Sequence, residues 1–103
     1  MLYLDNNSTT KIDKEILNEM LPYLSESYGN SASRTHKLGW DANDAVKKAR
    51  KRVANLINAK PDEITFNSGS TEGINFLIKG VFEEYLEKGN HIITVKTEHK
   101  AVL

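Results

Sequence analysis

The chain has 103 residues, enough for one small domain with a modest core. Its 14 Lys and Arg residues balance 14 Asp and Glu residues, so the overall charge favours neither nucleic acid nor an acidic membrane surface as a partner. It contains no cysteine, which excludes disulfides, a thiolate metal site and a cysteine nucleophile within these residues. No apolar run reaches the roughly 20 residues of a membrane span, and the N-terminus is unlike a signal peptide. We therefore expect a cytoplasmic protein with no membrane partner and no metal site.

The first elements follow from turn formers and helical spacing. Residues 2–4 form a short extended run, and the polar residues 5–10 predict a loop. Asp13 can cap a helix that runs to about Leu24, which Pro22 should kink or end. Residues 25–39 are rich in Gly, Asn and Ser and predict an irregular segment.

A second helix is predicted from Trp40 to Ile57, where seven apolar residues form one stripe. Its basic residues fall elsewhere on the helix surface. They lack the interleaved aromatic residues of a nucleic-acid site, so they indicate a solvated face. Pro61 and the two acidic residues after it should end this helix before the next element.

The second half of the chain alternates strand and helix. Residues 64–66 predict a short strand, and apolar residues from Ile74 to Leu86 repeat at helical spacing, with Gly89 as a stop. Residues 92–95 predict a second strand, so that the whole reads as a right-handed βαβ unit of an α/β fold. Ligands of such folds bind at the carboxyl ends of strands, where the loop 67–71 and His99 should face one crevice if the two strands are neighbours in the sheet.

The loop 67–71 has the composition of an anion site. The start of a helix offers unpaired N–H groups and a positive dipole end, Gly69 lets the backbone approach a ligand, and nearby hydroxyls add donors. The same Ser-Gly-Ser-Thr sequence also suits an ordinary turn that leads into a helix cap. It is neither a Walker A loop nor a dinucleotide fingerprint, because the required glycine spacings are absent.

Four segments together resemble one known family. Residues 3–10, 28–33, 64–72 and 97–103, in this order and at these separations, closely resemble the N-terminal quarter of cysteine desulfurases, pyridoxal-phosphate enzymes of the class V aminotransferase family. The resemblance implies the N-terminal portion of the aminotransferase-like fold. In it, residues 1–12 are an N-terminal segment and 13–103 begin the large cofactor-binding domain. Two positions depart from the family: Ser8, where Ala is frequent, and Ser31, where Pro is usual.

The resemblance also implies site residues. Ser70 and Thr71 correspond to the cup that binds the cofactor phosphate, and His99 to the catalytic residue that stacks on the pyridine ring and helps to move protons. An imidazole suits both tasks, since it is planar and exchanges protons near neutral pH. The residues taken alone leave His99 as an ordinary surface histidine after a strand.

The family's chemistry needs a Schiff-base lysine, an acid that pairs with the pyridine nitrogen, and a cysteine that carries persulfide. In the family all three lie beyond the matching segment, and Lys79, Lys96 and Lys100 do not stand at the lysine position. We therefore expect an N-terminal fragment, truncated or split, that is inactive alone and binds pyridoxal phosphate only non-covalently. The whole enzyme would convert L-cysteine to L-alanine and pass persulfide sulfur to a scaffold protein for iron–sulfur cluster or thio-cofactor assembly.

Two alternatives stay open. The chain could be part of another class V aminotransferase or lyase, which only residues outside it would reveal. It could also be a non-catalytic interaction module, because a two-stranded parallel sheet cannot cover its apolar surfaces. For an enzyme fragment we expect a homodimer or a complementary C-terminal chain as partner, and for the module a partner protein or another copy of the chain.

Overall fold

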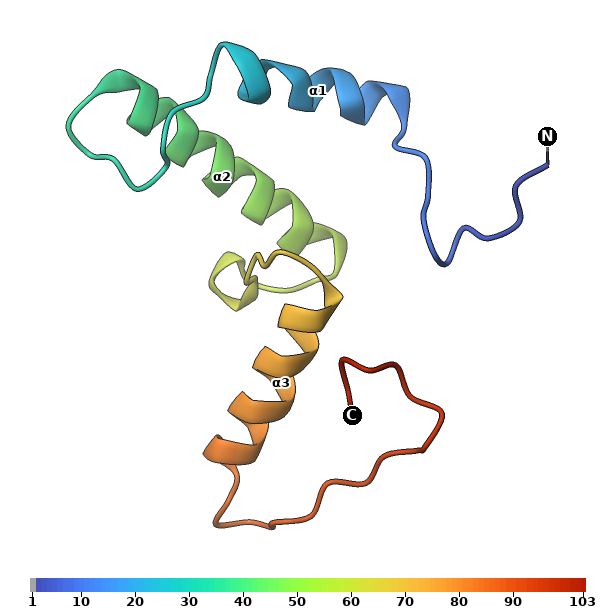
Figure 1. Cartoon of the computed structure of the whole chain (residues 1–103). Helices are drawn as coiled ribbons and strands as arrows, with labels where there is room; N and C mark the ends of the chain where they lie inside the picture. The colour runs from blue at the N-terminus through green and yellow to red at the C-terminus, as the bar shows by residue number, and fades with distance from the viewer. Residues whose placement is uncertain (1) are drawn as a thin grey trace. The chain divides into compact units, whose positions relative to one another are not determined.

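The computed structural model describes residues 2–103 and contains four helical elements (Figure 1). They are α1 (Lys14–Ser25), α2 (Lys37–Leu56), the short 3₁₀ helix η1 (Pro61–Glu63) and α3 (Ser70–Glu84). The chain divides into two compact units, one up to Ile64 and one from Thr65 to Leu103. No helix in the described residues is both long and apolar enough to cross a membrane. The expected division into residues 1–12 and the start of a large domain stays a prediction.

Helix α1 confirms the predicted cap and ends at Ser25, one residue after the predicted Leu24. The Asp13 carboxylate accepts a hydrogen bond from the Glu15 N–H at 2.8 Å, as an N-cap should. The helix continues to Ser25, three residues beyond Pro22, since proline removes one N–H donor without preventing the following turn. The Pro22 carbonyl then accepts from the Glu26 N–H at 2.9 Å.

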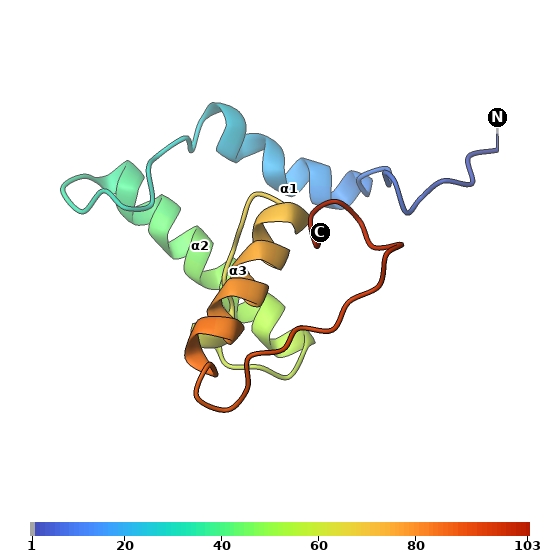
Figure 2. The ribbon, with the colours of Figure 1, turned by 60° about the horizontal axis from the view of Figure 1, so that its bottom comes forward.

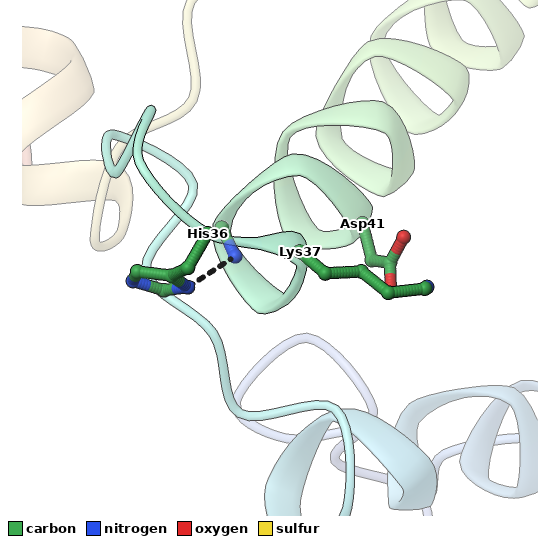
Figure 3. A network of polar contacts seen from close by, with 4 residues as sticks. His36, Lys37 and Asp41 are labelled. Carbon is green, nitrogen blue, oxygen red and sulfur yellow. Dashed lines mark hydrogen bonds and ion pairs between the residues drawn. The ribbon is translucent and has the colours of Figure 1, made fainter.

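Helix α2 begins at Lys37, earlier than the predicted Trp40, because His36 caps it. The Nδ1 atom of His36 accepts a hydrogen bond from the Gly39 N–H at 3.2 Å (Figure 3). The helix ends after Leu56, where Asn58 adopts a left-handed conformation with φ of 56° and the Ala59 N–H returns to the Ala54 carbonyl at 2.8 Å. The break thus comes before Pro61, in a turn that asparagine tolerates.

The small core of the described residues lies in the first unit. Its buried apolar residues are Ala42 and Ala54 on α2 and Ile64 after η1. Arg50 of α2 donates a hydrogen bond to the Ile64 carbonyl and so fixes the end of this unit against the helix. The second unit has no buried residue.

Helix α3 confirms the predicted helix, and its ends lie at Ser70 and Glu84. The Gly89 N–H donates to the Tyr85 carbonyl at 3.2 Å, which closes the turn after the helix. In Figures 1 and 2 the C-terminal segment then runs back beside α3 and ends near its first turns. The second unit is therefore a helix followed by a segment, residues 90–103, that runs back along it. We call this segment the returning strap.

The predicted βαβ unit does not form among the described residues: neither 64–66 nor 92–95 is a strand. Ile93, in the middle of the second candidate, is 96% exposed, so no sheet buries it. The physical reason is that strand backbone groups need a paired neighbour, and two short candidates make at most a marginal pair. The apolar and β-branched residues of these two segments favour strand structure, which would form only if other strands paired with them.

Candidate functional site

The loop before α3 is held by short-range hydrogen bonds. The Asn67 side-chain oxygen accepts from the Gly69 N–H at 2.9 Å, which forms a tight turn. The Glu72 carboxylate reaches back from the helix and accepts from the Ser68 N–H at 2.7 Å and from the Ser68 hydroxyl at 2.6 Å. Loop and helix start are thus fixed to each other by these hydrogen bonds.

Gly69 leaves the approach to the helix start open. Its φ of +155° is a conformation that residues with a side chain rarely adopt. A Cβ atom placed there would meet no described atom within 4 Å. The backbone at this position is therefore accessible to a ligand.

The first turn of α3 offers donors to that open space. Among the described residues, the N–H groups of Ser70, Thr71 and Glu72 have no acceptor, and the first backbone bond is from the Gly73 N–H to the Gly69 carbonyl at 3.1 Å. The hydroxyls of Ser70 and Thr71 also make no hydrogen bond within the described part of the chain. Unpaired N–H groups, two hydroxyls and the positive helix end are the donor set that suits a phosphate group. The residues present fit the phosphate of pyridoxal phosphate.

Glu72 is the one carboxylate in this first turn. The hydrogen bonds from the Ser68 side chain, and then from the Ser68 backbone, lower the pKa of the Glu72 carboxyl below its ordinary value. Glu72 therefore stays ionised near neutral pH and keeps the loop closed. A bound phosphate would share the helix start with this negative charge.

His99 lies in the returning strap, in a turn closed by the Val102 N–H, which donates to the His99 carbonyl at 2.8 Å. The Nδ1 atom of His99 accepts from the Ala101 N–H at 3.1 Å. Nδ1 therefore presents its lone pair to the backbone, and in the neutral ring the proton is on Nε2. His99 itself is exposed.

The second unit thus contains all three predicted site residues. Ser70 and Thr71 begin α3, and the turn that carries His99 is joined to the same helix through Asn75, which donates to the Ala101 carbonyl at 3.3 Å. The roles of the three residues stay predictions.

Two predicted loops belong to the first unit. In the loop 5–10 the Asp5 carbonyl accepts from the Ser8 N–H at 3.1 Å, and the Thr10 hydroxyl donates to the Asn6 carbonyl at 2.7 Å. The loop 28–36 is tied to α2 by the Trp40 indole N–H, which donates to the Arg34 carbonyl at 2.7 Å. The first loop is held by hydrogen bonds within itself, and the second by a side chain of α2.

Comparison with known proteins decides the family. The sequence profile of class V aminotransferases matches residues 2–103. The chain belongs to the class V aminotransferase family.

Cysteine desulfurases are the family members that it resembles. It is 56% identical over 102 residues to the cysteine desulfurase IscS of Neisseria meningitidis strain FAM18, a match that covers 99% of this chain and 25% of the relative. The mitochondrial cysteine desulfurase of Drosophila melanogaster is 54% identical over 102 residues, with 99% and 22% covered. The chain thus spans about a quarter of the length of these relatives. The resemblance to cysteine desulfurases is confirmed.

A solved structure confirms the broader fold. A NifS-like protein superposes with a TM-score of 0.83 at 43% identity, covering 94% of this chain and 26% of that protein. The described residues therefore follow the backbone course of an aminotransferase-like protein, although they do not form the strands of the expected βαβ unit.

Sequence reasoning missed the two residues that hold the site together. Glu72 is four positions after Ser68, a spacing close to that of a capping box, in which a glutamate returns to the backbone before the helix. Asn75 is four positions after Thr71 and so lies on the same helix face. Both spacings could have been used, but the partner of Asn75 at Ala101 could not have been read from the sequence.

Proposed function

We propose that residues 2–103 supply the phosphate-binding part of the cofactor site of a pyridoxal-phosphate-dependent cysteine desulfurase. One observation carries the proposal: unpaired N–H groups and two hydroxyls directly follow the open backbone at Gly69, where α3 begins. The 56% identity to a cysteine desulfurase supports the choice of cofactor and reaction. The complete enzyme would convert L-cysteine to L-alanine and hand on the sulfur as persulfide.

Pyridoxal phosphate, when bound, supplies an electron sink for bond cleavage at the substrate's carbon atoms. The residues of this chain bind and orient it. The N–H groups of Ser70 and Thr71 and their hydroxyls donate to phosphate oxygens, and the positive end of α3 favours the negative charge. The anchored phosphate limits where the ring can lie.

His99 is proposed to lie against the ring and to move a proton at Nε2. The Ala101 N–H occupies Nδ1, so Nε2 is the nitrogen left for exchange with the reacting group. The lysine, the acid and the cysteine of the family's chemistry are proposed to come from residues outside these 103, which contain no cysteine.

Partners and location are part of the same proposal. We infer a cytoplasmic enzyme that works as a homodimer or with a complementary C-terminal chain, and that delivers sulfur to a scaffold protein. The purified 103-residue chain should release no sulfide from cysteine beyond a protein-free control that contains pyridoxal phosphate. Release above that control contradicts the assignment of the reacting groups to other residues.

Binding tests the loop itself. Titration with pyridoxal phosphate, followed by the ¹H–¹⁵N signals of Ser70 and Thr71, should reveal weak, non-covalent binding. The absorbance of a Schiff base between the cofactor and a lysine should not appear. Replacing Thr71 with Ala should weaken it by about 1–3 kcal/mol, the usual loss for a hydrogen bond to a charged group. Thr94→Ala, the same chemical change in the returning strap, is the matched control. Equal affinity of Thr71→Ala and parent shows that the loop is not the phosphate site.

A non-catalytic interaction module is the second candidate. It is favoured by the open apolar hollow of about 380 Å³ along α3, lined by Leu77, Val81, Phe82, Tyr85 and Ile92 among others. A chain that binds no pyridoxal phosphate but forms a stable complex with another protein through this hollow would fit the module instead.

A further inference from the structure

The side-chain amide of Asn75 joins two parts of the second unit. Its Nδ2 atom donates to the Thr71 carbonyl, one turn earlier on α3, at 3.0 Å. The same nitrogen donates to the Ala101 carbonyl at 3.3 Å, across 26 positions of sequence. A primary amide carries two hydrogens on one nitrogen, so both bonds form at once.

The second of these bonds holds the residue that orients His99. The Ala101 backbone is engaged on both sides: its carbonyl accepts from Asn75, and its N–H donates to Nδ1 of His99 at 3.1 Å. Ala101 is partly buried, whereas His99 is exposed. Asn75 therefore acts on the imidazole through a single intervening residue, Ala101, whose carbonyl and N–H belong to neighbouring peptide groups.

We propose that Asn75 is a positioning residue that ties the turn carrying His99 to the helix carrying the phosphate loop. It fixes the Ala101 backbone at its carbonyl, and through the adjoining Ala101 N–H keeps Nδ1 of His99 as an acceptor and Nε2 as the exchangeable nitrogen. The consequence for the cofactor rests on the proposed function, since it needs phosphate at Ser70 and Thr71 and a ring at His99. The placement of the His99 ring itself does not.

Asn75→Asp is the sharpest variant, because it keeps the shape and removes both donors. Its carboxylate faces the Thr71 and Ala101 carbonyl oxygens, so the link should break. Asn90→Asp, the same change in the same unit outside the link, is the matched control. The Ala101 N–H should exchange roughly fivefold faster in Asn75→Asp, the effect of losing one typical hydrogen bond. The Asn90→Asp chain should match the parent.

The decisive readout is the tautomer of His99, from long-range ¹H–¹⁵N correlations of its ring. We expect the parent to hold the Nε2–H form, and Asn75→Asp to show the tautomer mixture of a free histidine, with amide protection in α3 retained. An unchanged His99 ring in Asn75→Asp overturns the proposal. Should Asn75→Asp unfold α3, the parent alone decides: the Asn75 amide protons must show contacts to Ala101, and their absence also overturns it.

Inorganic phosphate separates this inference from the proposed function. Phosphate should shift the Ser70 and Thr71 signals equally in parent and Asn75→Asp, while pyridoxal phosphate should perturb the His99 ring in the parent and less in the variant. If neither ligand binds the parent, the proposed cofactor site is wrong, and the His99 tautomer still tests the link. If pyridoxal phosphate perturbs His99 equally in both chains, Asn75 is not a positioning residue.

Discussion

A Cβ atom added to Gly39 would lie 2.4 Å from the Ser33 carbonyl oxygen, so the loop before α2 rests directly on the first turn of that helix. Gly29 makes the same kind of close contact, with a Cβ position 2.1 Å from the Leu38 carbonyl oxygen. Two glycines thus allow two backbones to touch where side chains would keep them apart.

Gly39→Ala should therefore destabilise the first unit. Backbone and loop must move to admit the methyl group, and overpacking of this kind costs about 1–3 kcal/mol. Gly80→Ala is the control: Gly80 lies inside α3 with nothing within 4 Å of its Cβ position, so alanine should stabilise that helix by about 0.5–1 kcal/mol. Amide-exchange protection measures both. Equal protection of α2 in Gly39→Ala and parent would show that the loop gives way freely.

The cap of α2 gives a second prediction. Figure 3 shows His36 beside the first turn, with its Nδ1 joined to the Gly39 N–H, while the Lys37–Asp41 ion pair lies on the exposed helix surface. His36→Ala should cost about 1 kcal/mol of helix stability, and His36→Asn should retain most of it, because asparagine is a good N-cap. Lys37→Ala should have little effect, since exposed ion pairs contribute little. Equal loss in the Ala and Asn variants would exclude capping as the cause.

Glu72 gives the pH dependence. Its pKa is lowered in the folded chain by the hydrogen bonds from Ser68, so the ionised form favours the closed loop. This contribution is complete above the ordinary carboxyl pKa of glutamate and is lost as the pH falls through the lowered value. The Ser68 N–H should therefore be protected near neutral pH and lose protection in acid. In Glu72→Gln the protection should be weaker at neutral pH and should not change over this range. If protection of the Ser68 N–H in the parent did not change with pH, the Glu72 carboxylate would not be what keeps the loop closed.

The helices could be predicted because their cause is local. Apolar residues at helical spacing and Asp13 as a cap fix α1, and the same spacing fixes α2 and α3. The start of α2 was placed late because His36 is not among the usual capping residues. The unpaired N–H groups of Ser70 and Thr71 could also be predicted, because these residues stand at the start of a predicted helix.

The strands could not be predicted in the same way, because their cause is not local. Ile93 and its neighbours have strand propensity, yet a strand forms only against a partner, and the described residues offer none. The link from Asn75 to Ala101 likewise depends on how the strap returns to α3. This hydrogen bond could not be predicted because its two partners lie far apart in the sequence.

The exposed apolar face of α3 gives the last prediction. Leu77 is 62% exposed and Val81 54% exposed, and both line the open hollow of the second unit. Burying such residues against another molecule is favourable by about 25 cal/mol per Å² of apolar surface. We therefore expect the chain to self-associate as its concentration rises, which sedimentation velocity would reveal. Val81→Glu should shift this association to higher concentration, because it places a charge in the hollow. Phe76→Glu changes a residue that is 63% exposed outside that lining and should have a smaller effect. A folded parent that stays monomeric at all concentrations would show that this face needs no cover.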